Sequence, residues 1–197
     1  MKKHILILML VGIFITINAK SLELNFENNH PYPWQSVSTW KVDKNSKILS
    51  MIGSKKSFFG FGNVFNLYFT KSINFKDGEI TVEFKANSGD TDEGGGIMWR
   101  VQDKDNYYIA RFNPLEDNFT YYKVIKGDRI ELKNSDIKLS SGWHKMKIIQ
   151  KDTHFEGFLD GKKLLEFNDN SIQKSGGIGV WTKTDAKTSF KNLLVEP

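Results

Sequence analysis

Short runs in which apolar and polar residues alternate, separated by turn residues, fill the chain from about Leu22 onward. A period of two places successive side chains on opposite faces of a strand. The clearest case is the run 80–85, in which Ile80, Val82 and Phe84 face one way and polar residues face the other. No segment after Leu22 carries apolar residues at the i, i+3, i+4 and i+7 spacing of an amphipathic helix. The pattern therefore predicts an all-β protein.

About fourteen strands are expected from these runs and from the turn residues that bound them. The turns are short, and no repeat period or linker-like tract divides the chain, which favours one large antiparallel sandwich over residues 20–197. Asp160-Gly161 is typical of a two-residue hairpin turn, since both positions favour positive φ, and Lys126-Gly127-Asp128 predicts another turn. The expected strands are Leu22–Glu27, Val37–Asp43, Lys47–Ile52, Val64–Lys71, Glu79–Asn87, Gly95–Gln102, Tyr107–Asn113, Phe119–Ile125, Arg129–Lys133, Trp143–Lys151, His154–Asp160, Lys163–Phe167, Gly177–Lys183 and Ser189–Val195.

One hairpin, from Gly94 to Tyr122, carries most of the functional signal. A turn at Asp103–Asn106 would pair Gln102 with Tyr107 and set Arg100 opposite Ile109. In that register Arg100 and Arg111 are diagonal neighbours on the non-core face. The core face would hold Ile97, Trp99, Val101, Tyr108, Ala110 and Phe112, and the opposite face Met98, Arg100, Tyr107, Ile109, Arg111 and Asn113. The arginines are then either ligand-binding groups or ordinary solvated strand residues.

Residues 1–19 have the form of an export signal. Lys2 and Lys3 precede an apolar run from Ile5 to Ile17, and Ala19 supplies a small residue at the expected cleavage point. The run of about 13 residues is shorter than the roughly 20 that span a bilayer as a helix, so no stable membrane anchor is expected. We predict a periplasmic or secreted protein.

Composition narrows the function classes. The 28 basic residues exceed the 23 acidic ones by only five and are scattered, which argues against nucleic acid as a partner. The chain has no cysteine, which excludes disulfides, thiolate metal sites and cysteine nucleophiles. Aromatic residues reach 13%, and those on a free sheet face would suit stacking on sugar rings.

Motifs for common catalytic chemistries are missing. His30, His144 and His154 show no metal-binding spacing, and no serine nucleophile elbow, dinucleotide fingerprint or phosphate loop is present. Gly94-Gly95-Gly96 begins a strand where backbones crowd. Paired carboxylates for glycan chemistry remain, with Glu116 in a loop after the Arg111 strand and Asp185 in the loop after Trp181-Thr182-Lys183.

Two acidic loops raise the question of calcium. The residues 90–93 and 103–106 are rich in oxygen ligands, but neither loop has the EF-hand pattern. We expect no cofactor and no metal, with calcium in one of these loops as the alternative.

Four segments resemble the 3-keto-disaccharide hydrolase domain family. They are GGGIMWRVQDKDNYYIARFNPLEDNFTYYKVIKGDR, WHKMKIIQKD, FLDGKKLLEF and GGIGVWTKTDAKTSF, and the similarity runs from about Leu22 to the C-terminus. Looser similarity extends to laminin-G-like domains and glycoside hydrolase family 16. The resemblance implies a concanavalin-A-like jelly-roll sandwich of two antiparallel sheets, with a ligand on the concave one.

The resemblance also implies a carbohydrate or glycoside as partner, and action on glycosides oxidised at C3. The keto group acidifies the C2–H bond, so that a base takes the proton and the C1–O bond breaks. Arg100 and Arg111 would stabilise the enolate, with Glu116 or Asp185 as the base. Ligand-binding residues expected beside them are Trp34, Asn106, Tyr107, Asn113, Asn118, Trp181 and Lys183.

Three interpretations stay open at this point. The first is a hydrolase of keto-glycosides. The second is a non-catalytic carbohydrate-binding or protein-interaction sandwich of the cell envelope, with aromatic rings stacking on the ligand and arginines donating hydrogen bonds. In the third, the arginines form structural salt bridges with Glu116 and Asp185.

Overall fold

The computed structural model describes residues 21–27, 32–54 and 64–197. The described residues form fifteen strands and no helix, and they therefore contain no helix that could cross a membrane. The predicted export signal, residues 1–19, lies outside the described residues. The strands are β1 (Leu22–Leu24), β2 (Trp34–Val37), β3 (Thr39–Asp43), β4 (Ile48–Gly53), β5 (Phe65–Phe75), β6 (Gly78–Ser88), β7 (Gly95–Asp103), β8 (Asn106–Asn113), β9 (Asn118–Ile125), β10 (Asp128–Asp136), β11 (His144–Lys151), β12 (His154–Leu159), β13 (Lys162–Asn168), β14 (Gly176–Lys183) and β15 (Lys187–Glu196).

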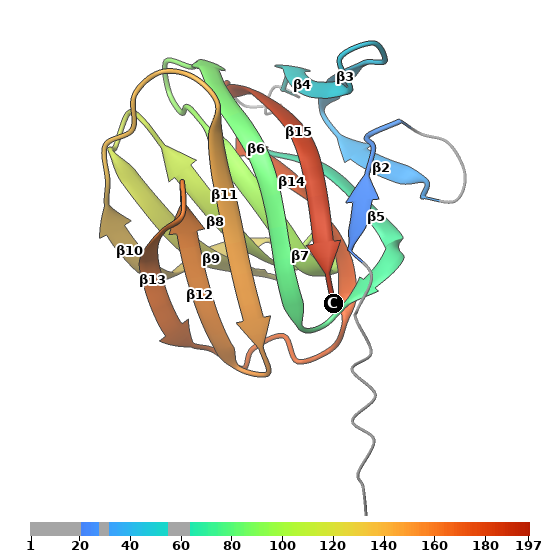
Figure 1. Ribbon diagram of the computed structural model, residues 1–197, viewed down its shortest axis with the longest axis vertical. Helices are drawn as coiled ribbons and strands as arrows, with labels where there is room; N and C mark the ends of the chain where they lie inside the picture. Colours follow the sequence, from blue (N-terminus) through green and yellow to red (C-terminus); the bar gives the residue numbers. More distant parts are fainter. Residues whose placement is uncertain (1–20, 28–31, 55–63) are drawn as a thin grey trace, which may run out of the picture.

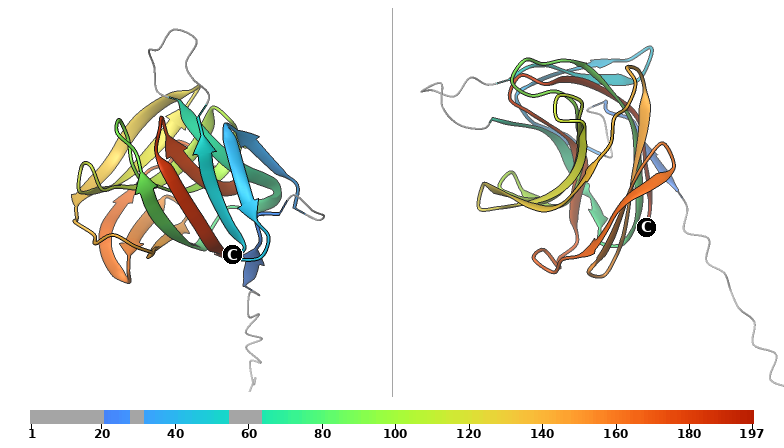
Figure 2. Two further views of the ribbon diagram at one scale, coloured as in Figure 1. Left: turned by 90° about the horizontal axis from the view of Figure 1, so that it is seen from above. Right: turned by 90° about the vertical axis from the view of Figure 1, so that its left-hand side faces the viewer.

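Two antiparallel sheets pack face to face (Figures 1 and 2). The eight-stranded sheet has the order β13-β12-β11-β6-β15-β4-β3, with β1 paired to β15. The seven-stranded sheet has the order β10-β9-β8-β7-β14-β5-β2. The chain crosses between the sheets several times, for example from β5 to β6 and from β6 to β7, so the sheets are interleaved in sequence. The predicted all-β jelly-roll sandwich is confirmed.

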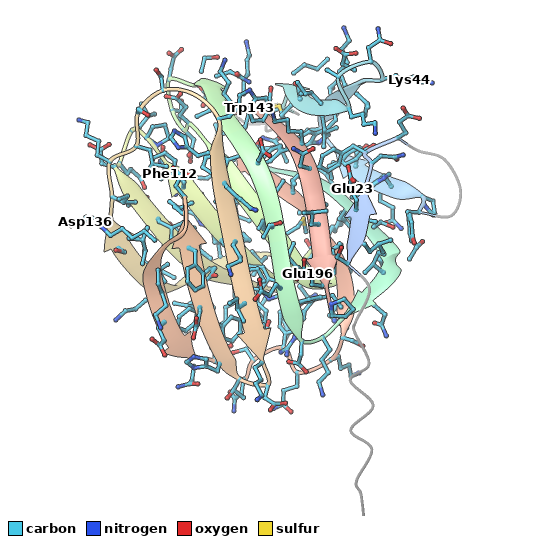
Figure 3. The ribbon with its side chains drawn as sticks, viewed as in Figure 1. Glu23, Lys44, Phe112, Asp136, Trp143 and Glu196 are labelled. Carbon is cyan, nitrogen blue, oxygen red and sulfur yellow. The ribbon has the colours of Figure 1, made fainter. Side chains whose placement is uncertain are left out.

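The main core lies between the sheets, where the alternation of each strand directs its apolar residues. Phe112 on β8, labelled in Figure 3, packs there against Phe84 on β6, with ring centroids 6.0 Å apart. Around Trp99, the rings of Tyr108, Tyr121 and Phe155 lie 5.5 to 6.1 Å away by centroid. All of these rings are at most 2% exposed, so this aromatic packing joins the sheets.

The predicted hairpin turns are confirmed. Leu159 pairs with Lys162 across Asp160-Gly161, whose φ values are 48° and 81°. Ile125 pairs with Asp128 across a turn that uses only Lys126 and Gly127. One predicted strand, Val37–Asp43, was wrong as a single element. Ser38 has φ 81°, which breaks the extended chain and sends β2 and β3 to different sheets.

The predicted register of the β7–β8 hairpin holds only at its turn, where Asp103 pairs with Asn106, and was wrong for the rest of the hairpin. Ile109 pairs with Met98, and a bulge between Trp99 and Asp103 interrupts the ladder. Arg100, with φ 46°, stands in this bulge. The bulge shifts Val101 to the face predicted for Arg100, and Arg100 leaves that face. The other predicted faces of this hairpin are confirmed.

Candidate functional site

A second apolar cluster lies on the face of the seven-stranded sheet that is turned away from the other sheet. We call this the outer face, and it corresponds to the concave side of this strongly curved sheet (Figure 2). The strand register sets its polar and charged residues beside the apolar ones. The buried members of the cluster are Leu67, Phe69, Met98, Val101, Tyr107, Ile109, Tyr122, Val124 and Trp181.

The curvature brings distant strands together on the outer face. Strands β10 and β14 are separated by β9, β8 and β7, which in a flat sheet means about 19 Å at about 4.8 Å per strand. Nevertheless the guanidinium of Arg129 on β10 lies 5.9 Å from the ring centroid of Trp181 on β14. It also lies 4.3 Å from the ring of Tyr122 on β9. Side chains from opposite sides of the sheet thus converge.

A network of charges occupies one end of this face. Arg111 Nη2 lies 2.8 Å from Asp92 Oδ1, and Lys183 Nζ lies 2.9 Å from Asp92 Oδ2. Arg111 Nη1 reaches Glu116 Oε2 at 3.4 Å and the Tyr122 hydroxyl at 3.3 Å. Arg111 and Asp92 are only 1% and 2% exposed, whereas Glu116 is 51% exposed. Two cations and two carboxylates balance, and Glu116 is the member that solvent reaches.

Glu116 is held as a carboxylate. Burial raises its pKa, but the charge of Arg111 and hydrogen bonds from Asn118 and Asn113 outweigh burial and lower the pKa below its ordinary value. Asn118 donates through Nδ2 to Glu116 Oε2 at 3.0 Å, and Asn113 accepts a hydrogen bond from the Leu115 backbone N–H at 3.1 Å. These contacts position an ionised group at the rim of the outer face.

Asp185 stabilises the loop that carries Asp92. Its carboxylate accepts hydrogen bonds from the backbone N–H groups of Asp90, Thr91 and Asp92 at 2.8 to 3.2 Å. Burial raises its pKa, but the hydrogen bonds from these three donors outweigh burial and lower the pKa below its ordinary value. Asp185 therefore fixes the loop that presents Asp92 and is not a free base.

Polar atoms without partners concentrate on the outer face. Among the described residues, seven buried side-chain N or O atoms make no hydrogen bond, and only Thr81 Oγ1 lies elsewhere. An unsatisfied buried polar atom costs about 1 to 3 kcal/mol, so six on one face call for a functional explanation. The six are Tyr107 Oη, Arg111 Nε, Asn118 Oδ1, Thr120 Oγ1, Arg129 Nη1 and Trp181 Nε1.

Tyr107 illustrates the character of this face. Burial raises the pKa of its hydroxyl well above the ordinary value. The nearby Trp181 indole N–H and the Arg129 charge lower this pKa by less than burial raises it, and the Asp105 charge raises it. The hydroxyl therefore stays protonated and can donate a hydrogen bond as well as accept one. Together with the indole N–H and the guanidinium, it gives the centre of the outer face mainly hydrogen-bond donors.

Arg100 does not join this site. Its guanidinium donates to the backbone carbonyls of Lys76, Ile172 and Asp152 at 2.9, 2.7 and 3.0 Å, and it pairs with Asp77 at 3.3 Å. The prediction that Arg100 and Arg111 share a face was wrong, because the bulge directs Arg100 toward the turns at the end of the sandwich. Arg100 ties three of those connections together.

Two further expected residues lie apart from the outer face. Trp34 packs in the main core, stacked on Tyr68 with ring centroids 5.1 Å apart. Asn106 lies at the β7–β8 turn, where Nδ2 donates to Asp103 and Oδ1 accepts from the Lys126 backbone N–H. The structure brings together Arg111, Glu116, Tyr107, Asn113, Asn118, Trp181 and Lys183 on the outer face.

Sequence reasoning missed four residues of this face. In the sequence Asp92 stands in an acidic loop, and Arg129, Tyr122 and Thr120 stand in strands without a motif around them. The alternation in β9 and β10 does place Thr120, Tyr122 and Arg129 on the face of Arg111. The contact of Arg129 with Trp181 depends on the curvature of the sheet, which the alternation of apolar and polar residues does not predict.

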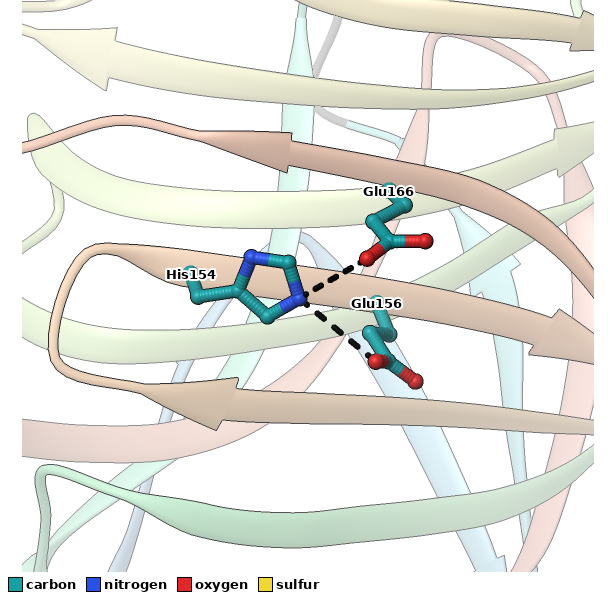
Figure 4. Close-up of side chains that lie close together, drawn as sticks. All are labelled: His154, Glu156 and Glu166. Carbon is teal, nitrogen blue, oxygen red and sulfur yellow. Dashed lines mark ion pairs between the residues drawn. The ribbon is translucent and has the colours of Figure 1, made fainter.

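A histidine and two glutamates meet on the eight-stranded sheet, far from this face in the fold. His154 Nε2 lies 3.5 Å from Glu156 Oε1 and 3.2 Å from Glu166 Oε1 (Figure 4). The spacing in the sequence did not predict this group, because Glu166 comes close to the other two residues only through the pairing of β13 with β12. Lys163 Nζ already pairs with both glutamates, at 3.7 and 2.6 Å, so a cation of the protein itself contacts both carboxylates.

Comparisons with solved structures show that other proteins share this sandwich fold. Solved structures similar to the chain include the carbohydrate-binding module CBM66 from Bacillus subtilis, with a TM-score of 0.67 and 20% identity over 81% of this chain and 92% of that one. A lichenase from a mouse hindgut metagenome matches with a TM-score of 0.61 and 11% identity over 89% and 98%. A Bacillus subtilis protein with a galectin-like fold matches with a TM-score of 0.62 and 12% identity over 83% and 88%.

Sequence comparison is more specific. No match was found among curated proteins. Residues 33–196, which include every strand except β1 and every residue of the outer face named above, match the family described as the 3-keto-alpha-glucoside-1,2-lyase-like domain. The chain belongs to the 3-keto-alpha-glucoside-1,2-lyase-like domain family, as its resemblance to 3-keto-disaccharide hydrolase domains implied.

Proposed function

We propose that the outer face of the seven-stranded sheet binds a carbohydrate. The observation that carries the proposal is the gathering of six buried, unpartnered polar atoms among aromatic rings on one curved face. A saccharide presents hydroxyls that donate and accept hydrogen bonds, and apolar C–H faces that pack on rings. Family membership and the likeness to a carbohydrate-binding module point the same way.

Cleavage of a 3-keto-glycoside is the second candidate, and the charge network favours it. Glu116 is ionised and reachable by solvent, and Arg111 Nη1 lies 3.4 Å from it. Glu116 would take the C2 proton, leaving an enolate whose charge the guanidinium stabilises. Collapse of the enolate restores the ketone, forms the C1–C2 double bond and breaks the C1–O bond. The proton then goes to the departing oxygen.

Titration calorimetry with methyl 3-keto-α-glucoside and methyl α-glucoside tests binding, and methanol release tests cleavage. Glu116→Gln should keep the affinity within about threefold while slowing methanol release by at least 100-fold, because it removes the base and little of the contact surface. Arg111→Lys should slow release as well. A Glu116→Gln variant with full turnover would contradict the catalytic role and leave the binding role standing. Absence of binding to either sugar by the wild type would contradict both.

Export belongs to the same proposal, since residues 1–19 have the form of a cleavable leader. The protein made from its full gene should be recovered from the periplasm or medium with its N-terminus after Ala19. Recovery from the cytoplasm with Met1 in place would contradict export. Cell fractionation and N-terminal sequencing give the answer.

A further inference from the structure

Arg129 is a cation on the outer face that no carboxylate neutralises. Among the described residues, Arg100 pairs with Asp77 and Arg111 pairs with Asp92, whereas Arg129 enters no ion pair. Glu131, two residues along β10, is exposed and does not pair with it. Asp105, whose charge also acts on Tyr107, is itself paired with Lys104 at 2.6 Å, so the Arg129 charge remains in excess of the balanced network around Arg111.

The guanidinium is also fixed in place. It lies over the ring of Tyr122 at 4.3 Å and near the ring of Trp181 at 5.9 Å, and its Nη1 is buried without a hydrogen-bond partner. Ring contacts stabilise the flat face of a guanidinium, but they leave its N–H groups at the edge unsatisfied. A desolvated, unpaired N–H on a cation is costly, which indicates that the partner comes from outside the chain.

Most of the neighbouring unpartnered atoms also need a hydrogen-bond acceptor as their partner. Arg111 Nε and Trp181 Nε1 can only donate, and the Tyr107 hydroxyl is a protonated donor. Asn118 Oδ1 is the one atom of the set that can only accept. A neutral sugar offers a similar number of donors and acceptors, whereas a carboxylate offers acceptors alone and matches the fork of an arginine.

We propose that the outer face takes an acidic saccharide, whose carboxylate is bound by Arg129. The inference rests on the proposed carbohydrate binding and adds the chemical class of the ligand. Arg129 would act as the residue that separates uronate-containing glycans from neutral ones.

Calorimetry with trigalacturonate and a hyaluronan tetrasaccharide, each beside its carboxyl-reduced form, tests this. The wild type should bind at least one acidic probe about tenfold or more tightly than its reduced form, and added salt should diminish that preference. Arg129→Gln should remove the preference, so that the variant binds the acidic and the reduced form with equal affinity. Lys133→Gln, which replaces an exposed cation of the same strand, is the matched control and should keep the preference of the wild type.

The outcomes separate the two proposals. Equal affinity for the acidic and reduced forms, or a preference that persists in Arg129→Gln, overturns the role of Arg129. Binding of neutral sugars alone also overturns it, while carbohydrate binding survives. If no sugar of either kind binds, carbohydrate binding itself fails. Unfolding curves of the wild type and the two variants should coincide within about 2 °C, because Arg129 is only half-buried and enters no ion pair with a described residue, and this result excludes a folding defect as the cause.

Discussion

At the scale of single residues, the hydroxyls of two buried tyrosines separate function from stability. Tyr107 Oη has no partner, whereas Tyr121 Oη donates to the Glu156 carbonyl at 2.8 Å in the main core. Tyr107→Phe removes an unsatisfied group and should leave the free energy of unfolding unchanged or raise it by about 0.5 kcal/mol. It should also weaken saccharide binding by about fivefold or more.

Tyr121→Phe is the matched control, since it should cost about 1 kcal/mol of stability and leave the affinity unchanged. Urea denaturation and titration calorimetry on both variants measure these effects. A Tyr107→Phe protein that is destabilised yet binds normally would contradict the assignment of Tyr107 to the site.

For Arg100 we expect an effect on stability and none on saccharide binding. Its guanidinium holds three backbone carbonyls and Asp77, so Arg100→Met leaves several buried acceptors without donors. The variant should lose about 3 kcal/mol in the free energy of unfolding and keep its saccharide affinity within twofold. Lys104→Met, which removes a 66% exposed cation of the same hairpin, should cost less than about 0.5 kcal/mol. A stable Arg100→Met protein that no longer binds sugar would reverse this assignment.

At this scale the sequence pattern predicted most side-chain directions but not the bulge. Alternation in β7 and β8 correctly sorted Ile97, Trp99 and Met98 between the faces. It failed at Arg100 and Val101 because the positive φ of Arg100 depends on contacts with turns more than twenty residues away, which the local sequence does not contain.

At the scale of elements, the loop before β7 depends on one carboxylate. Asp185 accepts three backbone N–H groups from residues 90–92, and its pKa is lowered in the folded protein. A depressed folded pKa gives stability that is present above the ordinary value of 3.8 and is lost as the pH falls through the folded value. Asp185→Asn should be about 1 to 2 kcal/mol less stable than the wild type at pH 7.

The difference in stability between the two proteins should therefore shrink as the pH drops below about 4. Urea denaturation at a series of pH values from 7 to 2.5 measures it. A difference that stays constant over this range would show that the Asp185 charge does not hold the loop.

Most elements were predictable because their apolar residues alternate and their turns carry Gly or Asp at positive φ. The split of residues 37–43 into β2 and β3 was not, since Ser38 rarely adopts φ 81°. In the structure the Ser38 hydroxyl bonds to the Asn66 side chain, and Asn66 in turn donates to Thr182 and to the Thr184 carbonyl. That support comes from β5 and from the end of β14, far along the chain.

At the scale of the whole molecule, the main core stabilises the fold and the outer face carries the candidate site. The main core between the two sheets holds the aromatic rings that fix the fold, and the outer face of the curved sheet holds the atoms left without partners. The sequence predicted the sandwich and its family. It did not predict which strands would approach one another across the outer face, because the pairing order and the curvature arise from the assembled sheet.

The indole N–H signals of the tryptophans test carbohydrate binding on the outer face most directly. The chain has five tryptophans. Trp181 Nε1 is unpartnered on the outer face, while Trp99 Nε1 donates to Gln150 Oε1 at 2.5 Å in the main core. In a ¹⁵N-¹H correlation spectrum titrated with methyl 3-keto-α-glucoside, the Trp181 indole signal should shift progressively and saturate, and the Trp99 signal should stay in place. A saturating shift at Trp143, on the other side of the sandwich, with Trp181 unmoved would contradict the account.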